Sequence, residues 1–192
     1  MLALRKTEPA FGAVLEDVPE PEAPEGYVVV EVDAVGICGS DIHMYEWTSG
    51  YEWLIPALPV TMGHEFSGRV AKLGPGAEDI AVGQRVVVMP GATCMTCEAC
   101  RSRKFDLCQN RKGIGLSADG GFARLVAVPA RNCLPVGDDL PAHIAALAEP
   151  LVVGDRAVSF GDVEAGQKVV CLAPASSASP PPISQSGRAR AM

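Results

Sequence analysis

The chain has 192 residues, of which 48% are hydrophobic, so it can bury the core of one ordinary domain and part of a second. Its 23 acidic and 16 basic residues give a net charge of −7, which argues against a nucleic-acid-binding surface. The N-terminus becomes charged before an apolar run of signal length develops, and no run reaches the roughly 20 apolar residues of a membrane span. We therefore expect a globular, cytoplasmic protein with no nucleic-acid or membrane partner.

Short strands separated by turns predict a mainly β fold with short helices. Residues 8–26 hold four prolines among acidic residues, which is typical of a loop or an edge segment. Stretches of β-branched, partly alternating residues follow, each bounded by glycine or proline, at 27–35, 66–73, 85–89 and 122–128. Helical patterns come late, at 141–147 and at 149–160. The strand pattern indicates a small antiparallel barrel.

Two short motifs between the first strands carry groups that can perform chemistry. A glycine-bearing loop at 36–43 holds a thiol, a hydroxyl, a carboxylate and an imidazole within six residues, namely Cys38, Ser40, Asp41 and His43. Twenty residues on, His64 and Glu65 stand at the start of a strand. A catalytic zinc keeps three protein ligands and one open position, which Cys38, His64 and a carboxylate would provide. Taken singly, Cys38 and His64 are better interpreted as a buried free thiol and a hydrogen-bonded core histidine, and Ser40 and Asp41 are residue types that commonly cap turns. The four-cysteine cluster described next shifts the interpretation to a metal site.

Four of the seven cysteines lie within fifteen residues at the spacing C-x2-C-x2-C-x7-C, namely Cys94, Cys97, Cys100 and Cys108. Two-residue loops let neighbouring thiolates converge on one ion, and four thiolates close the tetrahedral shell of Zn2+. The alternatives are a pair of disulfides or an iron–sulfur cluster. The absence of a secretory signal and of a ferredoxin-like spacing favours a structural zinc.

The chain resembles the zinc-containing medium-chain dehydrogenases in four motifs that occur in the order found in that family. These motifs are the segments 36–43 and 63–65, the cysteine run and Glu149-Pro150-Leu151. That family comprises alcohol, sorbitol, butanediol and threonine dehydrogenases. The resemblance implies a GroES-like, partly open β-barrel catalytic domain at residues 1–148, with a structural-zinc lobe at about 90–112. It further implies two Zn2+ ions, one structural and one catalytic, a Rossmann domain for NAD or NADP, and homo-oligomers among full-length relatives.

Carried over residue by residue, the resemblance supplies ligands for the catalytic zinc. Cys38 and His64 would bind it, and the further carboxylate ligands, bound directly or through water, would be Glu65 and Glu149. Zinc acting as a Lewis acid would lower the pKa of a substrate hydroxyl towards neutrality, which prepares hydride transfer to the nicotinamide.

The resemblance also assigns roles to the polar residues around these ligands. Ser40 would hydrogen-bond the substrate hydroxyl and His43 would pass the proton outward, while Asp41 would orient the zinc-binding histidine. Three further residues have no metal-like partners in the sequence. His143 reads as a surface or core histidine, and Cys133 and Cys171 read as small apolar fillers.

The motifs favour a small-molecule alcohol as the substrate. Glu149-Pro150-Leu151 points to the sorbitol, butanediol and threonine dehydrogenases, and residues 43–47 resemble the threonine enzymes. The threonine enzymes carry a histidine three residues before the first lobe cysteine, where this chain has Gly91, so we expect a polyol, diol or other secondary alcohol. The alternative is a non-catalytic zinc-binding domain, which nucleotide binding would distinguish. A zinc-free quinone reductase is disfavoured because such proteins lack the cysteine lobe and the Cys38/His64 pair.

The resemblance ends near Leu172. Residues 149–172 look like the start of a Rossmann domain, but the glycine loop and roughly 150 further residues of the family are not found. Residues 173–192 instead have a disordered composition. Every alanine codon begins with GC, and Ala173, Ala175 and Ala178 have the spacing of phosphate-loop glycines. We therefore expect a truncated family member with a frameshift near residue 172, which would leave this chain inactive.

Overall fold

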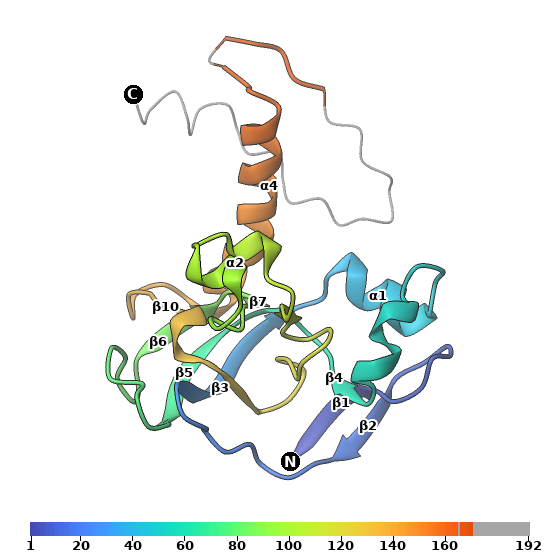
Figure 1. Cartoon of the computed structure of the whole chain (residues 1–192), viewed down its shortest axis with the longest axis vertical. Coiled ribbons are helices and arrows are strands. Elements are labelled where there is room, and N and C mark those ends of the chain that lie inside the picture. Colours follow the sequence, from blue (N-terminus) through green and yellow to red (C-terminus); the bar gives the residue numbers. More distant parts are fainter. Residues whose placement is uncertain (165, 171–192) are drawn as a thin grey trace.

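The computed structural model of the protein describes residues 1–164 and 166–170, which form a curved β-structure from which one long helix projects (Figure 1). The strands are β1 Leu2–Lys6, β2 Val14–Asp17, β3 Tyr27–Gly36, β4 Val60–Thr61, β5 Glu65–Leu73, β6 Arg85–Val88, β7 Gly91–Ala92, β8 Lys112–Gly113, β9 Leu125–Pro129 and β10 Cys133–Pro135. The α-helices are α1 Gly39–Glu46, α2 Glu98–Arg101, α3 Ala142–Ala145 and α4 Ala148–Phe160. The 3-10 helices are η1 Glu52–Ala57, η2 Phe105–Leu107 and η3 Ala130–Asn132.

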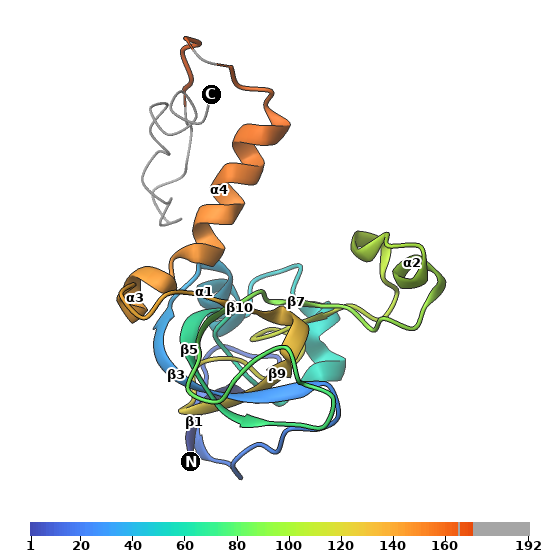
Figure 2. The same ribbon diagram turned by 90° about the vertical axis from the view of Figure 1, so that its left-hand side faces the viewer.

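β3 is the central strand of the fold. Within the described residues the main sheet has five antiparallel strands in the order β10-β6-β5-β3-β9, and a smaller sheet has the order β2-β1-β4. β3 pairs with β5 from Val28 opposite Leu73 to Gly36 opposite Glu65. Figure 2 shows β3, β5 and β9 curving round the same interior, while α2 lies on a lobe well away from them. This architecture confirms the expected fold class of mainly β structure with short helices.

Two apolar clusters hold the barrel together. The main cluster lies between the strands and includes fully buried Val28, Val30 and Val86 together with Phe66. The second cluster lies under α1 and combines Met44, Leu54, Val60 and Met62. Each fully buried side chain of this size contributes about 1.5–3 kcal/mol through removal of apolar surface from water. The second cluster therefore fixes α1 against the segment that precedes β5.

Most of the predicted elements are present, with one important correction in the segment 36–43. The predicted strands at 27–35 and 66–73 correspond to β3 and β5, and the late helices correspond to α3 and α4. The segment 36–43 was expected to be a loop, but the chain turns into α1 at Gly39. The Asp41 carboxylate accepts a hydrogen bond from the Cys38 N–H at 2.9 Å and so caps the helix. Aspartate is common in turns, but here Asp41 stabilises the first turn of a helix.

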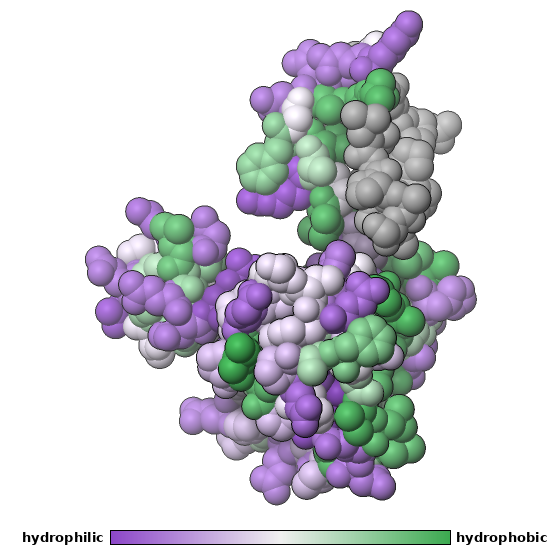
Figure 3. Space-filling view, turned by 90° about the vertical axis from the view of Figure 1, so that its right-hand side faces the viewer, coloured by the Kyte–Doolittle hydropathy of each residue, from purple (hydrophilic) through white to green (hydrophobic). Residues whose placement is uncertain are grey.

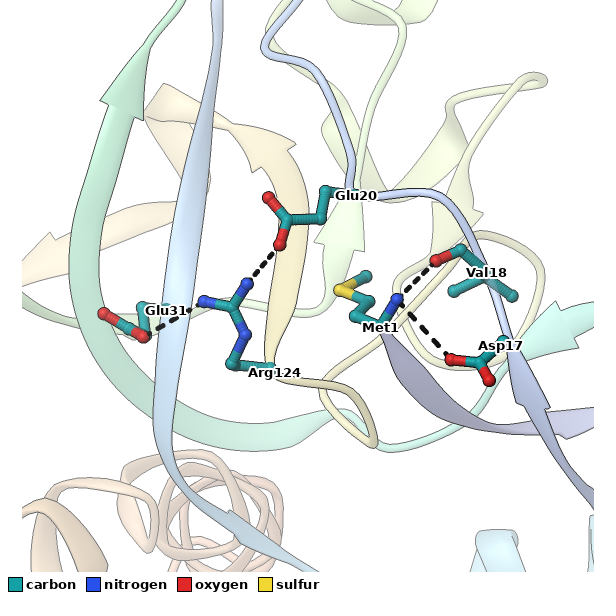
Figure 4. Close-up of polar contacts among 6 residues, drawn as sticks. All are labelled: Met1, Asp17, Val18, Glu20, Glu31 and Arg124. Carbon is teal, nitrogen blue, oxygen red and sulfur yellow. Dashed lines mark hydrogen bonds and ion pairs between the residues drawn. The ribbon is translucent and has the colours of Figure 1, made fainter.

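Polar contacts fasten the proline-rich segment before β3 to the sheets (Figure 4). The Met1 ammonium donates to the Val18 carbonyl at 2.7 Å. Arg124, just before β9, pairs with Glu20 and, at 3.4 Å, with Glu31 on β3. The arginine and both carboxylates are exposed, so these pairs add little stability. They do define the path of the segment along the edge of the barrel.

α4 projects from the barrel, and none of its side chains is buried. Exposed apolar residues on it include Val152, Val153 and Phe160, and Figure 3 shows apolar surface on this projecting part. The predicted second domain would begin in this helix, at residue 149. Residues 166–170 contain no strand, and the rest of the predicted Rossmann start, with the tail at 173–192, lies outside the described residues. No helix among the described residues is long and apolar enough to cross a membrane.

A glycine-rich loop after β8 supports the backbone in front of His64. The Gly121 N–H donates to the Gly63 carbonyl at 2.8 Å, and the Gly120 N–H donates to the Thr61 carbonyl at 2.9 Å. A Cβ atom added to Gly115 would lie 2.2 Å from the Gly63 carbonyl oxygen and 2.9 Å from the His64 nitrogen. The two backbones thus approach more closely than any side chain would allow.

We predict that Gly115→Ala lowers the free energy of unfolding by about 2–4 kcal/mol, because it combines an unfavourable positive φ with overpacking against Gly63. The matched control is Gly76→Ala, since Gly76 has φ +74 against φ +80 at Gly115 but nothing within 4 Å of an added Cβ. The control should lose only about 1–2 kcal/mol. Urea denaturation of both variants measures the difference, and equal losses would contradict the tight approach.

Candidate metal centres

Four cysteine sulfurs converge in the lobe that carries α2. Cys94 follows β7, Cys97 is the N-cap of α2, Cys100 lies within α2, and Cys108 follows η2. All four Sγ atoms lie within 4.8 Å of one another. The large apolar residues Met95, Phe105 and Leu107 of this lobe are exposed, and its helices α2 and η2 are only four and three residues long. The convergence of the sulfurs is therefore the main feature that organises it.

The sulfur geometry fits a tetrahedral metal better than it fits disulfides. The Cys94 Sγ lies 3.6 Å from the Cys108 Sγ and 4.0 Å from the Cys100 Sγ. A zinc ion with Zn–S bonds of about 2.3 Å places its sulfurs roughly 3.8 Å apart, whereas a disulfide bond is about 2.05 Å long. The Cys97 N–H points to the Cys94 Sγ at 3.4 Å, and the Cys94 N–H points to the Cys108 Sγ at 3.4 Å. These amides can stabilise thiolates, the form in which cysteine binds metal.

A second group of ligand atoms lies where β3 ends and β5 begins. The Cys38 sulfur, the His64 imidazole and the Glu65 carboxylate all approach within 4.8 Å of one another. Cys38 is the N-cap of α1, whereas His64 and Glu65 enter β5. The register of β3 and β5 places Gly36 opposite Glu65. A Cβ at Gly36 would lie 2.5 Å from the Glu65 Oε2, so glycine leaves the space that this carboxylate occupies.

Asp41 and Ser40 hold the His64 ring from two sides. The Asp41 Oδ1 lies 3.6 Å from the His64 Nδ1, and Ser40 Oγ lies 3.3 Å from the His64 Nε2. The Asp41 carboxylate is 2% exposed, and its other oxygen caps α1. Asp41 therefore fixes both the start of the helix and the orientation of the ring. The buried Asp41 Oδ1 and His64 Nδ1 lack a close hydrogen-bond partner among the described residues.

The surroundings of His64 favour a positive charge. Burial alone would lower the pKa of His64, but the nearby Asp41 carboxylate and Cys38 sulfur outweigh it and raise the pKa to about 10. A proton or a metal ion can supply that positive charge, since both bind an imidazole flanked by anionic groups. The donor set of thiolate, imidazole and carboxylate is one that zinc accepts. The residues present thus fit a catalytic type of zinc site.

The other predicted site residues are placed less centrally. Glu149, in the first turn of α4, is not in the group of ligand atoms within 4.8 Å, so its role as a ligand stays a prediction. Burial raises its pKa, with an opposing effect from His64. His43 is exposed, and its ring faces Tyr51 at a centroid distance of 6.2 Å. Tyr51, which no sequence motif indicates, also lies near the centre, and its pKa is raised by burial and by the negative charges of Cys38 and Asp41.

Two of the residues predicted to have no metal role are described by the structure, and neither belongs to a group of ligand atoms. His143 is exposed on α3, and Cys133 is buried with its pKa raised to about 12 by burial. Cys171 lies outside the described residues. A cavity of about 650 Å³ lies between the cysteine lobe, the barrel and α4, and its lining includes Glu149, Gly91 and Arg111. Glu149 therefore faces a space large enough for a small molecule.

The chain is similar to known dehydrogenases. The family described as alcohol dehydrogenase GroES-like domain matches residues 24–138. The L-threonine 3-dehydrogenase of Thermococcus kodakarensis is 42% identical over 153 residues, which are 79% of this chain and 43% of that protein. The structure of 2R,3R-butanediol dehydrogenase from Bacillus subtilis has a TM-score of 0.75 at 33% identity and covers 87% of this chain and 49% of that one. The alcohol dehydrogenase of Aeropyrum pernix has a TM-score of 0.75 at 31% identity, covering 84% and 48%. The chain thus spans about half of these relatives or less.

We predict that the two centres lose metal independently. Cys100→Ser should release the lobe metal and lower the melting temperature, because a structural ion contributes its binding energy to folding. His64→Ala should empty only the centre formed by Cys38, His64 and Glu65, here called the Cys38 centre. Cys133→Ala serves as the control, since Cys133 is a buried thiol outside both groups. Zinc content measured on purified protein should fall from two ions to one in each test variant, and unchanged content in both would refute the assignment.

We also predict a pH dependence of the metal-free protein that originates in His64. Its folded-state pKa of about 10 lies above its ordinary value of 6.5, so its stabilising effect is full below pH 6.5 and disappears as the pH rises through 10. The difference in unfolding free energy between the wild type and His64→Ala should shrink over that window. His143→Ala controls for the loss of an exposed imidazole. A difference that stayed constant from pH 6 to 10 would contradict this interpretation of the charges around His64.

Proposed function

Because the chain belongs to the alcohol dehydrogenase family that shares the GroES-like domain, we propose that it is the zinc-bearing part of an NAD(P)-dependent dehydrogenase. The substrate class would be a secondary alcohol, polyol or diol. The observation that carries the proposal is the convergence of the Cys38, His64 and Glu65 ligand atoms within 4.8 Å of one another. Three ligands at the end of a sheet leave a position for a substrate oxygen, whereas the four-cysteine lobe leaves none.

The chain's own residues would divide the work of alcohol oxidation. Cys38 and His64 would hold the catalytic zinc, and that ion would supply Lewis acidity. Ser40, whose Oγ lies 3.3 Å from the His64 Nε2, would hydrogen-bond the substrate hydroxyl. His43 is exposed and would pass the proton to solvent. Glu65 and Glu149 would supply carboxylates that neutralise the ion.

We propose that residues 1–148 form the catalytic domain, with the structural-zinc lobe at about 90–112, and that 149–172 begins a cofactor domain. Relatives about twice as long support this division, as does α4, which leaves the barrel without burying a side chain. NAD or NADP would bind mainly to that further domain, and longer relatives would form homo-oligomers. A cytoplasmic location is consistent with a lobe that needs reduced thiols.

L-Threonine is a second candidate substrate. The 42% identity to the Thermococcus kodakarensis enzyme supports it. The residue at position 91 argues for the polyol or diol instead, because it is glycine and not histidine. A Cβ at Gly91 would meet the Arg111 Nη2 at 2.7 Å, so a histidine there would require this flexible guanidinium to move. The cavity wall therefore differs at this position from the one expected of the threonine enzymes.

A non-catalytic zinc-binding domain is the alternative function. It would need the metal of the four-cysteine lobe for folding but no nucleotide. The four-cysteine lobe is compatible with either function, because a closed thiolate shell only stabilises structure. The Cys38 centre is the part that this alternative leaves without a role. Nucleotide binding by a longer form of the chain separates the two.

We predict that the 192-residue chain does not oxidise 2,3-butanediol, sorbitol or L-threonine with NAD+ or NADP+. Hydride transfer needs a nicotinamide held against the substrate carbon, and the described residues show no glycine loop that would bind its pyrophosphate. A chain extended through a one-base correction near codon 172 should bind NAD(H) or NADP(H) and oxidise a polyol or diol. Absorbance at the nicotinamide band measures both. Turnover by the 192-residue chain, free of host dehydrogenase, would contradict the proposal.

A further inference from the structure

Lys6, the last residue of β1, carries a positive charge that is completely buried. Its exposed fraction is 0%, and none of the ion pairs among the described residues involves it. Its Nζ donates to three backbone carbonyls, those of Ala10, of Gly12 at 2.8 Å and of Tyr45 at 3.1 Å. An ammonium group has three protons to donate, so all three are satisfied. A buried charge is costly without such partners, which makes this an exacting arrangement.

The three acceptors tie the end of α1 to a distant loop. Ala10 and Gly12 precede β2, whereas Tyr45 lies in the last turn of α1. The Gly12 N–H also donates to the Tyr45 carbonyl at 2.8 Å. The ring of Trp47, which ends α1 in a left-handed conformation, lies 5.3 Å from the Lys6 Nζ. A cation at this end of a helix is favoured by the helix dipole and by the aromatic face.

The backbone of Lys6 holds the other half of the metal centre. Lys6 is paired with Val60, and the preceding residue with Thr61, across β1 and β4. The Met62 N–H then donates to the Leu4 carbonyl at 3.1 Å. This segment runs directly into Gly63 and His64. One residue thus contacts both the helix that starts after Cys38 and the strand that leads to His64.

We propose that Lys6 is a positioning residue for the Cys38–His64–Glu65 centre, which it holds together by joining the end of α1 to the segment before β5. The inference rests on the proposed function, since it presumes a metal at this centre. α1 is only eight residues long, so displacement of its last turn also moves Ser40 and Asp41 at its start. The cysteine lobe makes no contact with the Lys6 ammonium and should be indifferent to it.

The test is titration of the metal-free 192-residue chain with Co2+, whose charge-transfer absorption is stronger with four thiolates than with one. Lys6→Met removes the ammonium but keeps the bulk of the side chain. We expect it to weaken Co2+ binding at the Cys38 centre about tenfold and to leave the four-cysteine centre unchanged, since partners that orient ligands commonly affect affinity by about 10–100-fold. Lys6→Gln, which retains a donor, should fall between Lys6→Met and the wild type.

Two controls separate positioning from general loss of stability. Arg5→Met removes the neighbouring cation, which donates to the Pro59 carbonyl at 2.8 Å but does not reach α1. Val128→Ala removes core volume from β9 at a residue that is 0% exposed. Both should lower stability without a preferential effect on the Cys38 centre. Equal weakening of that centre in Val128→Ala and Lys6→Met would overturn the proposal.

Amide hydrogen exchange supplies a readout that does not need metal. The amides of Trp47 and Thr48, which donate to the His43 carbonyl, should exchange faster in Lys6→Met relative to the β3–β5 amides. If Lys6→Met does not fold, Lys6→Gln decides by the same two measurements. Wild-type protein that binds Co2+ only at the cysteine lobe would refute the proposed function as well. Wild-type protein that binds two ions, with Lys6 variants that match it, would refute the positioning role alone.

Discussion

The antiparallel register of β3 and β5 is the constraint on which the candidate active centre depends. Because Gly36 lies opposite Glu65, Cys38 follows the end of one strand by two residues and His64 precedes the start of the other by one. Cys38 and His64, which are 26 positions apart in the sequence, therefore meet because the antiparallel pairing brings the two strand ends together. A slip of one residue would turn Glu65 to the opposite face of the sheet, where it could not approach the thiol. The glycine at position 36 is required at the same point, since any side chain would occupy the space of the carboxylate.

The two metal centres solve one electrostatic problem in different ways. Each gathers groups that are negatively charged when they bind metal, and each needs a cation to offset their repulsion. In the lobe, backbone amides that point to the Cys94 and Cys108 sulfurs share the charge. At the other centre, the pKa of His64 is raised to about 10, so its imidazole carries a proton at neutral pH when no metal is bound. A metal in the lobe would therefore stabilise its structure, whereas a metal at the Cys38 centre would replace the proton of His64.

The sequence predicted the parts of the site that depend on local spacing. The convergence of the cysteine run could be expected from its spacing alone, whereas His64 and Glu65 pointed to a metal only together with that run and with the family resemblance. α1 was not predicted, since Ser40 and Asp41 are common in turns and only their contacts with His64 and Cys38 reveal the helix start. The burial of Lys6 could not be predicted, because a lysine near the N-terminus is ordinarily exposed and its three acceptors come from tertiary structure.

The position of the Glu149 carboxylate, a further predicted ligand of the catalytic zinc, depends on how α4 packs. Glu149 lies in the first turn of α4, a helix in which no side chain is buried, so α4 is held to the barrel by few contacts. A small rotation of α4 moves the carboxylate relative to His64 and Glu65, both of which already affect its charge. A surface that covered Val152, Val153 and Phe160 would restrict that rotation through apolar burial. The position of Glu149 is therefore coupled to what packs against α4, as well as to the geometry of β3 and β5.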